Sequence, residues 1–161
     1  MAYRSDRHIV EALLPVRFLA SVVHYGVADP AADDAQQLIT WLKEAEREIV
    51  AGRSDKEAFK LARRSWSAYD HAMAPYLKEE ASCAKFGLIV FYLLALLEEQ
   101  EVYLFTPGSP FDQAQQALYG PEGTIVELAN IDAVDVSAQK QARRLLRSLQ
   151  DMGYFPEAVG I

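Results

Sequence analysis

Residues 86–97 read FGLIVFYLLALL, twelve apolar or glycine positions in succession, bounded by Lys85 and Glu98. A helix of this length rises only about 18 Å, whereas a membrane span needs about 20 apolar residues. A helix that is apolar on every side is typical of the centre of a helical bundle. We therefore expect a buried central helix and no membrane span. An oligomer interface and a lipid-facing surface remain the alternatives for this segment.

Helix-starting and helix-ending residues precede this stretch. Ser5 predicts the start of a first helix that runs to His24, and Pro15 is expected to kink or divide it because proline removes a backbone hydrogen bond. Asp29 and Pro30 stand in the order favoured at a helix start, which predicts a second helix ending near residue 51.

A capping box then predicts the third helix. Ser54 and Glu57 have the spacing at which each side chain accepts a hydrogen bond from the other's backbone amide. We expect Pro75 to end this helix and a fourth helix to cover residues 76–104. The residues expected to face inward are Phe59, Ala62, Trp66, Tyr69 and Met73.

Turn residues divide the remainder of the chain. Ser109 and Pro110 predict a short helix with Asp112 near its start, and a second short helix is expected near residues 125–129. Residues 130–136 fit neither the helical nor the strand period, so a loop and a short strand both remain open. The last helix is predicted from a cap at Ser137 to a stop at Gly153.

These segments predict an all-α fold, a single-domain helical bundle of about five to seven helices with a buried central helix, covering residues 1–161. The chain has 161 residues, of which 51% are hydrophobic and 24% are charged, so it can bury a core without disulfides. No internal repeat or long linker divides it.

Residue types that carry chemistry are sparse. The chain contains one cysteine and three histidines, with no histidine pair at chelating spacing and no phosphate-binding or nucleophile motif. We therefore expect no metal, no cofactor and no enzymatic activity. A catalytic bundle that uses Asp70, His71 or Glu98 is the lowest-ranked alternative.

The charged residues are distributed unevenly along the sequence. No lysine or arginine occurs in the 54 residues between Lys85 and Lys140, and several aromatic residues stand beside the turns there. Acidic groups speed and orient the approach of a basic partner, and aromatic rings provide anchors. The alternative is that the buried helix accounts for part of the gap, that the aromatic residues close the ends of the bundle, and that the acidic surface aids solubility. The predicted partner-binding residues are Glu98, Glu99, Glu101, Tyr103, Phe105, Phe111, Asp112, Tyr119, Glu122, Glu127, Asp132 and Asp135.

The favoured hypothesis is a small acidic protein-binding module that blocks a more basic protein partner. Its setting would be that of a bacterial immunity protein or antitoxin that inhibits a toxin in the cytoplasm. The formal net charge of −7 argues against nucleic acid as the partner, and a homo-oligomer remains open.

A second hypothesis is a ligand-sensing or regulatory domain with an apolar pocket between helices. The aromatic residues expected to line that pocket are Trp41, Trp66, Tyr69, Phe91 and Tyr92. Basic stripes on the third and last helices are consistent either with an anionic ligand or with solvated helix faces. Their members are Lys56, Lys60, Arg63, Arg64, Lys140, Arg143, Arg144 and Arg147.

Overall fold

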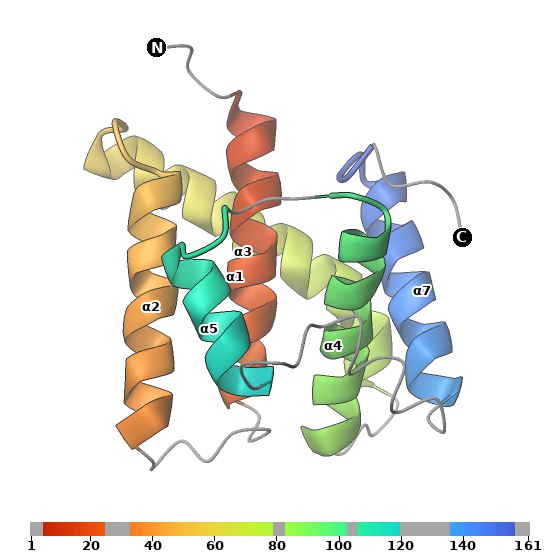
Figure 1. Ribbon diagram of the computed structural model, residues 1–161. Coiled ribbons are helices and arrows are strands. Elements are labelled where there is room, and N and C mark those ends of the chain that lie inside the picture. Colours follow the sequence, from red (N-terminus) through yellow and green to blue (C-terminus); the bar gives the residue numbers. More distant parts are fainter. Residues whose placement is uncertain (1–4, 25–32, 79–82, 103–105, 120–135, 157–161) are drawn as a thin grey trace.

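A computed structural model of the chain describes residues 5–24, 33–78, 83–102, 106–119 and 136–156 (Figure 1). Every regular element in these ranges is an α-helix, which confirms the all-α bundle. The helices are α1 (Asp6–His24), α2 (Asp33–Ile49), α3 (Asp55–Leu77), α4 (Cys83–Glu99), α5 (Pro110–Tyr119) and α7 (Val136–Asp151). The helix predicted near residues 125–129 lies outside the described residues, as does the ambiguous segment before Val136.

Helix α1 lies in the middle of the bundle, where it packs against α2, α3 and α4 (Figure 1). Its predicted bounds are confirmed, and the Ser5 hydroxyl accepts a hydrogen bond from the His8 backbone amide at 3.3 Å. Pro15 does not divide it, since the helix is continuous from Asp6 to His24. Nearly every side chain from Ile9 to Val23 is buried, so α1 is a central helix together with α4.

The apolar stretch that decides the fold is buried in α4. This helix packs against both α1 and α7, and Ile89, Val90 and Leu93 have no exposed surface. Leu88 and Leu96 are partly buried at its flanks. The expected span of residues 76–104 was too long, because α4 begins at Cys83 and ends at Glu99.

Helix α3 confirms one prediction and corrects two. The capping box is present, with the Ser54 hydroxyl accepting from the Glu57 amide. Pro75 lies inside α3 rather than at its end, because a proline in the last turn removes only one helical hydrogen bond before the helix stops at Leu77. Phe59 and Trp66, which were expected to face inward, are 69% and 39% exposed.

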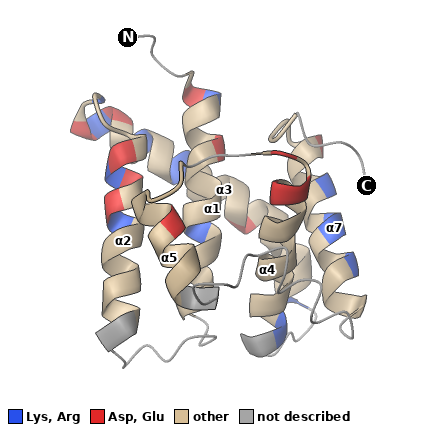
Figure 2. Ribbon diagram, in the orientation of Figure 1, with Lys and Arg blue, Asp and Glu red and all other residues tan. Residues whose placement is uncertain are grey.

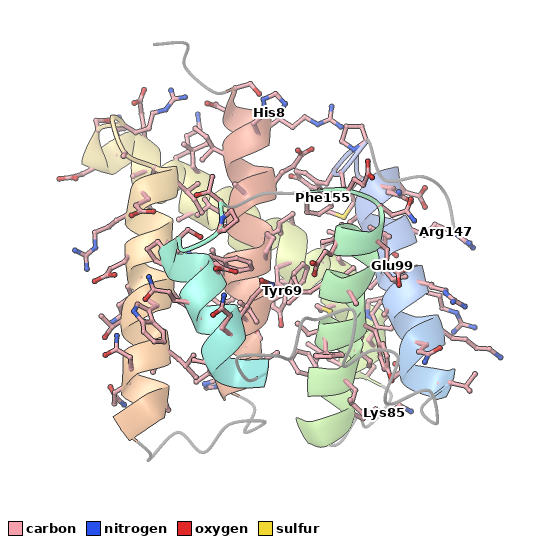
Figure 3. The ribbon with its side chains drawn as sticks, in the orientation of Figure 1. His8, Tyr69, Lys85, Glu99, Arg147 and Phe155 are labelled. Atoms are coloured by element: carbon pink, nitrogen blue, oxygen red, sulfur yellow. The ribbon has the colours of Figure 1, made fainter. Side chains whose placement is uncertain are left out.

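A buried carboxylate connects the first helix to the segment after the last one. Glu11 of α1 is only 6% exposed and accepts a hydrogen bond from the Phe155 backbone amide at 3.1 Å. The Arg7 guanidinium lies 3.5 Å from the same Glu11 oxygen. Figure 3 places Phe155 near the end of α7, where Gly153 turns the chain with a φ of +91°. The predicted stop at Gly153 is thereby confirmed, whereas α7 begins at Val136, one residue before Ser137.

Within the described ranges, no helix combines the length and apolar character needed to cross a membrane.

Candidate interaction surface

The predicted partner-binding residues fall into two groups. Glu98, Glu99, Glu101, Phe111 and Asp112 are described, and Tyr119 is the last residue of α5, with its side chain outside the description. The other six predictions lie outside the described residues: Tyr103, Phe105, Glu122, Glu127, Asp132 and Asp135. The candidate surface is therefore built from the end of α4 and the start of α5.

The end of α4 determines where its three glutamates lie. Glu101 adopts a left-handed backbone with a φ of +58°. Its amide donates to the Glu98 carbonyl at 3.0 Å, and the Val102 amide donates to the Leu97 carbonyl at 2.9 Å. This is a Schellman ending, in which glycine normally occupies the left-handed position. The turn leaves the Glu99 and Glu101 side chains exposed, and Glu98 is partly buried.

The charges at this helix end oppose the helix dipole. The C-terminus of a helix carries partial negative charge, so each carboxylate there costs about 0.3–1 kcal/mol relative to a neutral residue. Three glutamates stand in or directly after the last turn of α4 (Figure 2). Helix stability alone does not explain this placement.

Asp112 is held in position by the turn that opens α5. Its carboxylate accepts from the Gly108 amide at 2.8 Å and from the Gln116 side chain at 3.0 Å. The Asp112 amide in turn donates to the Ser109 hydroxyl at 3.2 Å, which confirms the predicted cap. These contacts fix the carboxylate near the start of the helix, where negative charge is favourable.

Glu98 at the end of α4 and Asp112 in the first turn of α5 influence each other electrostatically. Burial raises the pKa of the Glu98 carboxyl, and the negative charge of Asp112 raises it further. We call Glu98, Glu99, Glu101 and Asp112 the acidic edge. None of the four forms an ion pair with a residue that the structure describes, although α7, with its exposed cations, packs along α4 (Figures 2 and 3).

Phe111 does not contribute an exposed ring to this surface. It is 6% exposed and belongs to the core, because the first turn of α5 faces α2. Aromatic residues beside turns often pack into the core of a bundle, and Phe111 does so here. The described part of the acidic edge consequently offers carboxylates and no aromatic anchor from the predicted set.

The aromatic residues of the pocket hypothesis pack against neighbouring rings. Tyr69 lies 5.1 Å from Phe18 and 5.8 Å from Trp66, measured between ring centroids. Phe91 and Tyr92 pack edge to face at 5.7 Å. Trp41 is partly buried against the core.

The residues of the catalytic alternative do not form a metal-binding group in the described chain. Asp70 and His71 are exposed on α3. No group of three or more histidine, cysteine, aspartate or glutamate side chains that could hold a metal ion occurs among the described residues.

Sequence reasoning missed a charged cluster where α1, α2 and α3 meet. The Arg17 guanidinium lies 2.6 Å from the Glu46 carboxylate and 4.5 Å from the centre of the Trp66 ring. Burial lowers the pKa of Arg17, while the charge and hydrogen bond of Glu46 act in the opposite direction. The Nε atom of Arg17 is buried without a hydrogen-bond partner among the described residues. A lone arginine inside the apolar pattern of α1 is the signal that could have indicated this cluster.

The chain is thus an all-helical protein with an acidic edge at the end of one buried helix. No family model matches it, and no curated protein or solved structure does so either.

Proposed function

We propose that this protein is a small acidic binding module that blocks a more basic protein partner through the acidic edge. The observation that carries the proposal is the group of carboxylates at the end of α4, where Glu99 and Glu101 are exposed and oppose the helix dipole. The negative charge of Asp112 on α5 adds to burial in raising the pKa of Glu98. Carboxylates placed in this way do not stabilise the helix, whereas the cationic side chains of a partner would be attracted to them.

The mechanism is steric occlusion guided by charge. Glu99 and Glu101 are exposed and would meet the partner first, speeding its approach at low ionic strength. Glu98 and Asp112 lie at the same edge and would pair with lysine or arginine side chains once the surfaces close. A rigid helical scaffold suits this role because the backbone that carries the carboxylates does not have to be ordered on binding.

The biological setting that we propose is inhibition of a toxin in the bacterial cytoplasm by an immunity protein or antitoxin. An acidic inhibitor can cover a basic active site or substrate-binding surface without any chemistry of its own. This assignment rests on the acidic edge together with the scarcity of catalytic motifs in the sequence.

The test compares three baits in affinity capture from the source cell: the unaltered protein, Glu99→Lys/Glu101→Lys, and Asp55→Lys/Asp70→Lys. The control pair changes the net charge equally, and its residues are exposed on α3 away from the acidic edge. We expect the unaltered and control baits to retain one basic protein and the first variant to lose it.

Binding of the purified partner then measures the effect. Glu99→Lys/Glu101→Lys is expected to weaken affinity at least about tenfold, mostly through slower association that is sensitive to salt. If the partner is a toxin, coexpression of the unaltered protein restores growth and coexpression of this variant does not. Equal affinity for the two lysine variants would contradict the acidic-edge mechanism.

A further inference from the structure

The outer face of α3 exposes two large aromatic side chains. Phe59 and Trp66 are 69% and 39% exposed. Because they are seven residues apart, or nearly two helical turns, they lie on almost the same line along the helix. The opposite side of α3 is buried through Leu61, Ser65 and Ala68. The apolar pattern of this helix is therefore wider than the surface that the bundle itself covers.

Cations outnumber acids around Phe59. Lys56, Lys60 and Arg63 are exposed within one turn of it, as are Asp55 and Glu57, and none of the three cations forms an ion pair with a described residue. The neighbouring Arg64 differs, since it lies 3.6 Å from Asp6 of α1. We call Phe59 and Trp66, together with the three unpaired cations, the α3 aromatic surface.

Two neighbouring side chains pack against the Trp66 ring. The Arg17 guanidinium lies over its ring, and Tyr69 meets it edge to face at 5.8 Å. Arg17 is fixed in turn by Glu46 of α2 at 2.6 Å. A partly exposed tryptophan that packs against a partly buried ion pair has the properties of an interface hot spot, because little side-chain entropy is lost when a partner covers it.

We propose that the α3 aromatic surface binds an acidic amphipathic segment of a partner protein. Apolar side chains of that segment would cover Phe59 and Trp66, and its carboxylates would pair with Lys56, Lys60 and Arg63. This surface has the opposite charge to the acidic edge, so it is a second binding site and does not depend on the proposed function. Asp70, one turn beyond Trp66, makes an extended polyanion a poor fit to the same line.

The probe for this site is a synthetic helical peptide with leucines on one face and flanking glutamates. The matched control peptide carries lysine in place of each glutamate. The chain has two tryptophans, so Trp41→Phe leaves Trp66 as the only tryptophan reporter. We expect the acidic peptide to shift the emission of Trp66 to shorter wavelength and to bind at least about tenfold more tightly than the basic peptide.

Two variants locate the binding site. Phe59→Ser is expected to weaken binding of the acidic peptide roughly tenfold. Since Phe59 is largely exposed, urea unfolding should show an unchanged fold. Lys56→Glu/Lys60→Glu/Arg63→Glu should reverse the preference between the two peptides. The same number of reversals on α7, Lys140→Glu/Arg143→Glu/Arg144→Glu, and the acidic-edge variant Glu99→Lys/Glu101→Lys should each leave the affinity within about threefold.

Several results would overturn the proposal. They are equal binding of the two peptides, absence of acidic-peptide binding at about 1 mM, and an unchanged affinity of Phe59→Ser. Sedimentation that shows a dimer dissociated by Phe59→Ser would assign the surface to a second copy of this chain instead. Stronger binding to anionic vesicles or single-stranded RNA than to the peptide would assign it to those partners.

Discussion

Glu98 and Asp112 are two carboxyl groups of like charge on different helices, and the charge of Asp112 raises the pKa of Glu98. The Asp112 carboxylate is held by the Gly108 amide, whereas the hydrogen bonds that end α4 join backbone groups. The sequence predicted both as acidic site residues. Residue spacing alone could not reveal their interaction, because the two residues belong to different helices.

The pH dependence of stability tests this interaction. The folded state binds the Glu98 proton more tightly than the unfolded state does, because its pKa is raised by burial and by Asp112. This contribution to stability is complete below the ordinary pKa of glutamate and is lost as pH rises through the folded-state pKa. Glu98→Gln should therefore raise the free energy of unfolding at pH 7 by about 0.2–1 kcal/mol, a range that allows for solvent screening.

At about pH 3, where glutamate is protonated in both states, the same substitution should give no such gain. Urea unfolding at the two pH values measures the difference. Glu99→Gln, at the exposed neighbouring position, controls for loss of one negative charge. A gain of equal size at both pH values would show that Glu98 acts through packing rather than ionisation.

The sequence predicted the helices better than any other feature. The differences between predicted and observed helices lie mainly at the helix ends. The capping box of α3 and the cap of α5 were predicted correctly because they involve residues three positions apart. The end of α4 was predicted several residues too late. The left-handed position that ends a helix is usually glycine, which marks the end in a sequence, but here it is Glu101. Phe59 was wrongly predicted to be buried. The helical period predicts which face of a helix is apolar, but not how much of that face a neighbouring helix covers.

The left-handed backbone at Glu101 has a measurable cost. An L-residue with a side chain is strained there, whereas glycine adopts the conformation freely. Glu101→Gly should therefore raise the free energy of unfolding by about 1 kcal/mol. It should also weaken binding of the basic partner, because one carboxylate is lost. Chemical unfolding and partner binding measure the two effects. Glu101→Ala, which removes the carboxylate and keeps the strain, should weaken binding of the partner and stabilise the fold less than Glu101→Gly does.

For the whole molecule, the sequence predicted that α1 and α4 are part of the core. It did not predict which charged residues are buried with them. The apolar pattern of each helix identified it as part of the core, and both are now seen at its centre (Figure 1). The charged residues inside that core, Glu11 and Arg17, were not predicted to be buried. Arg7 is a local partner of Glu11, but Phe155 and Glu46 lie far along the chain or on another helix, at positions that no local pattern can reveal.

Removing the Glu11 carboxylate tests how strongly it supports the bundle. Glu11→Ala would leave the Phe155 amide without its acceptor and separate the end of α7 from α1. The loss of a buried hydrogen bond to a charged group should lower the free energy of unfolding by about 2–3 kcal/mol. Glu11→Gln keeps a carbonyl acceptor and should cost less than half as much. Thermal unfolding of both variants measures these losses of stability. Equal losses for Glu11→Ala and Glu11→Gln would indicate that the charge of Glu11 rather than its hydrogen bond matters.

The hydrogen bond between Glu11 and Phe155 joins residues 144 positions apart. A ribosome that adds roughly 5–20 residues per second needs several seconds or more to cover that distance. Throughout this interval the nascent chain carries the largely apolar α1 without this hydrogen-bond partner. The native packing of α1 therefore cannot be complete before Phe155 has been added, and aggregation during synthesis is the hazard that this topology creates.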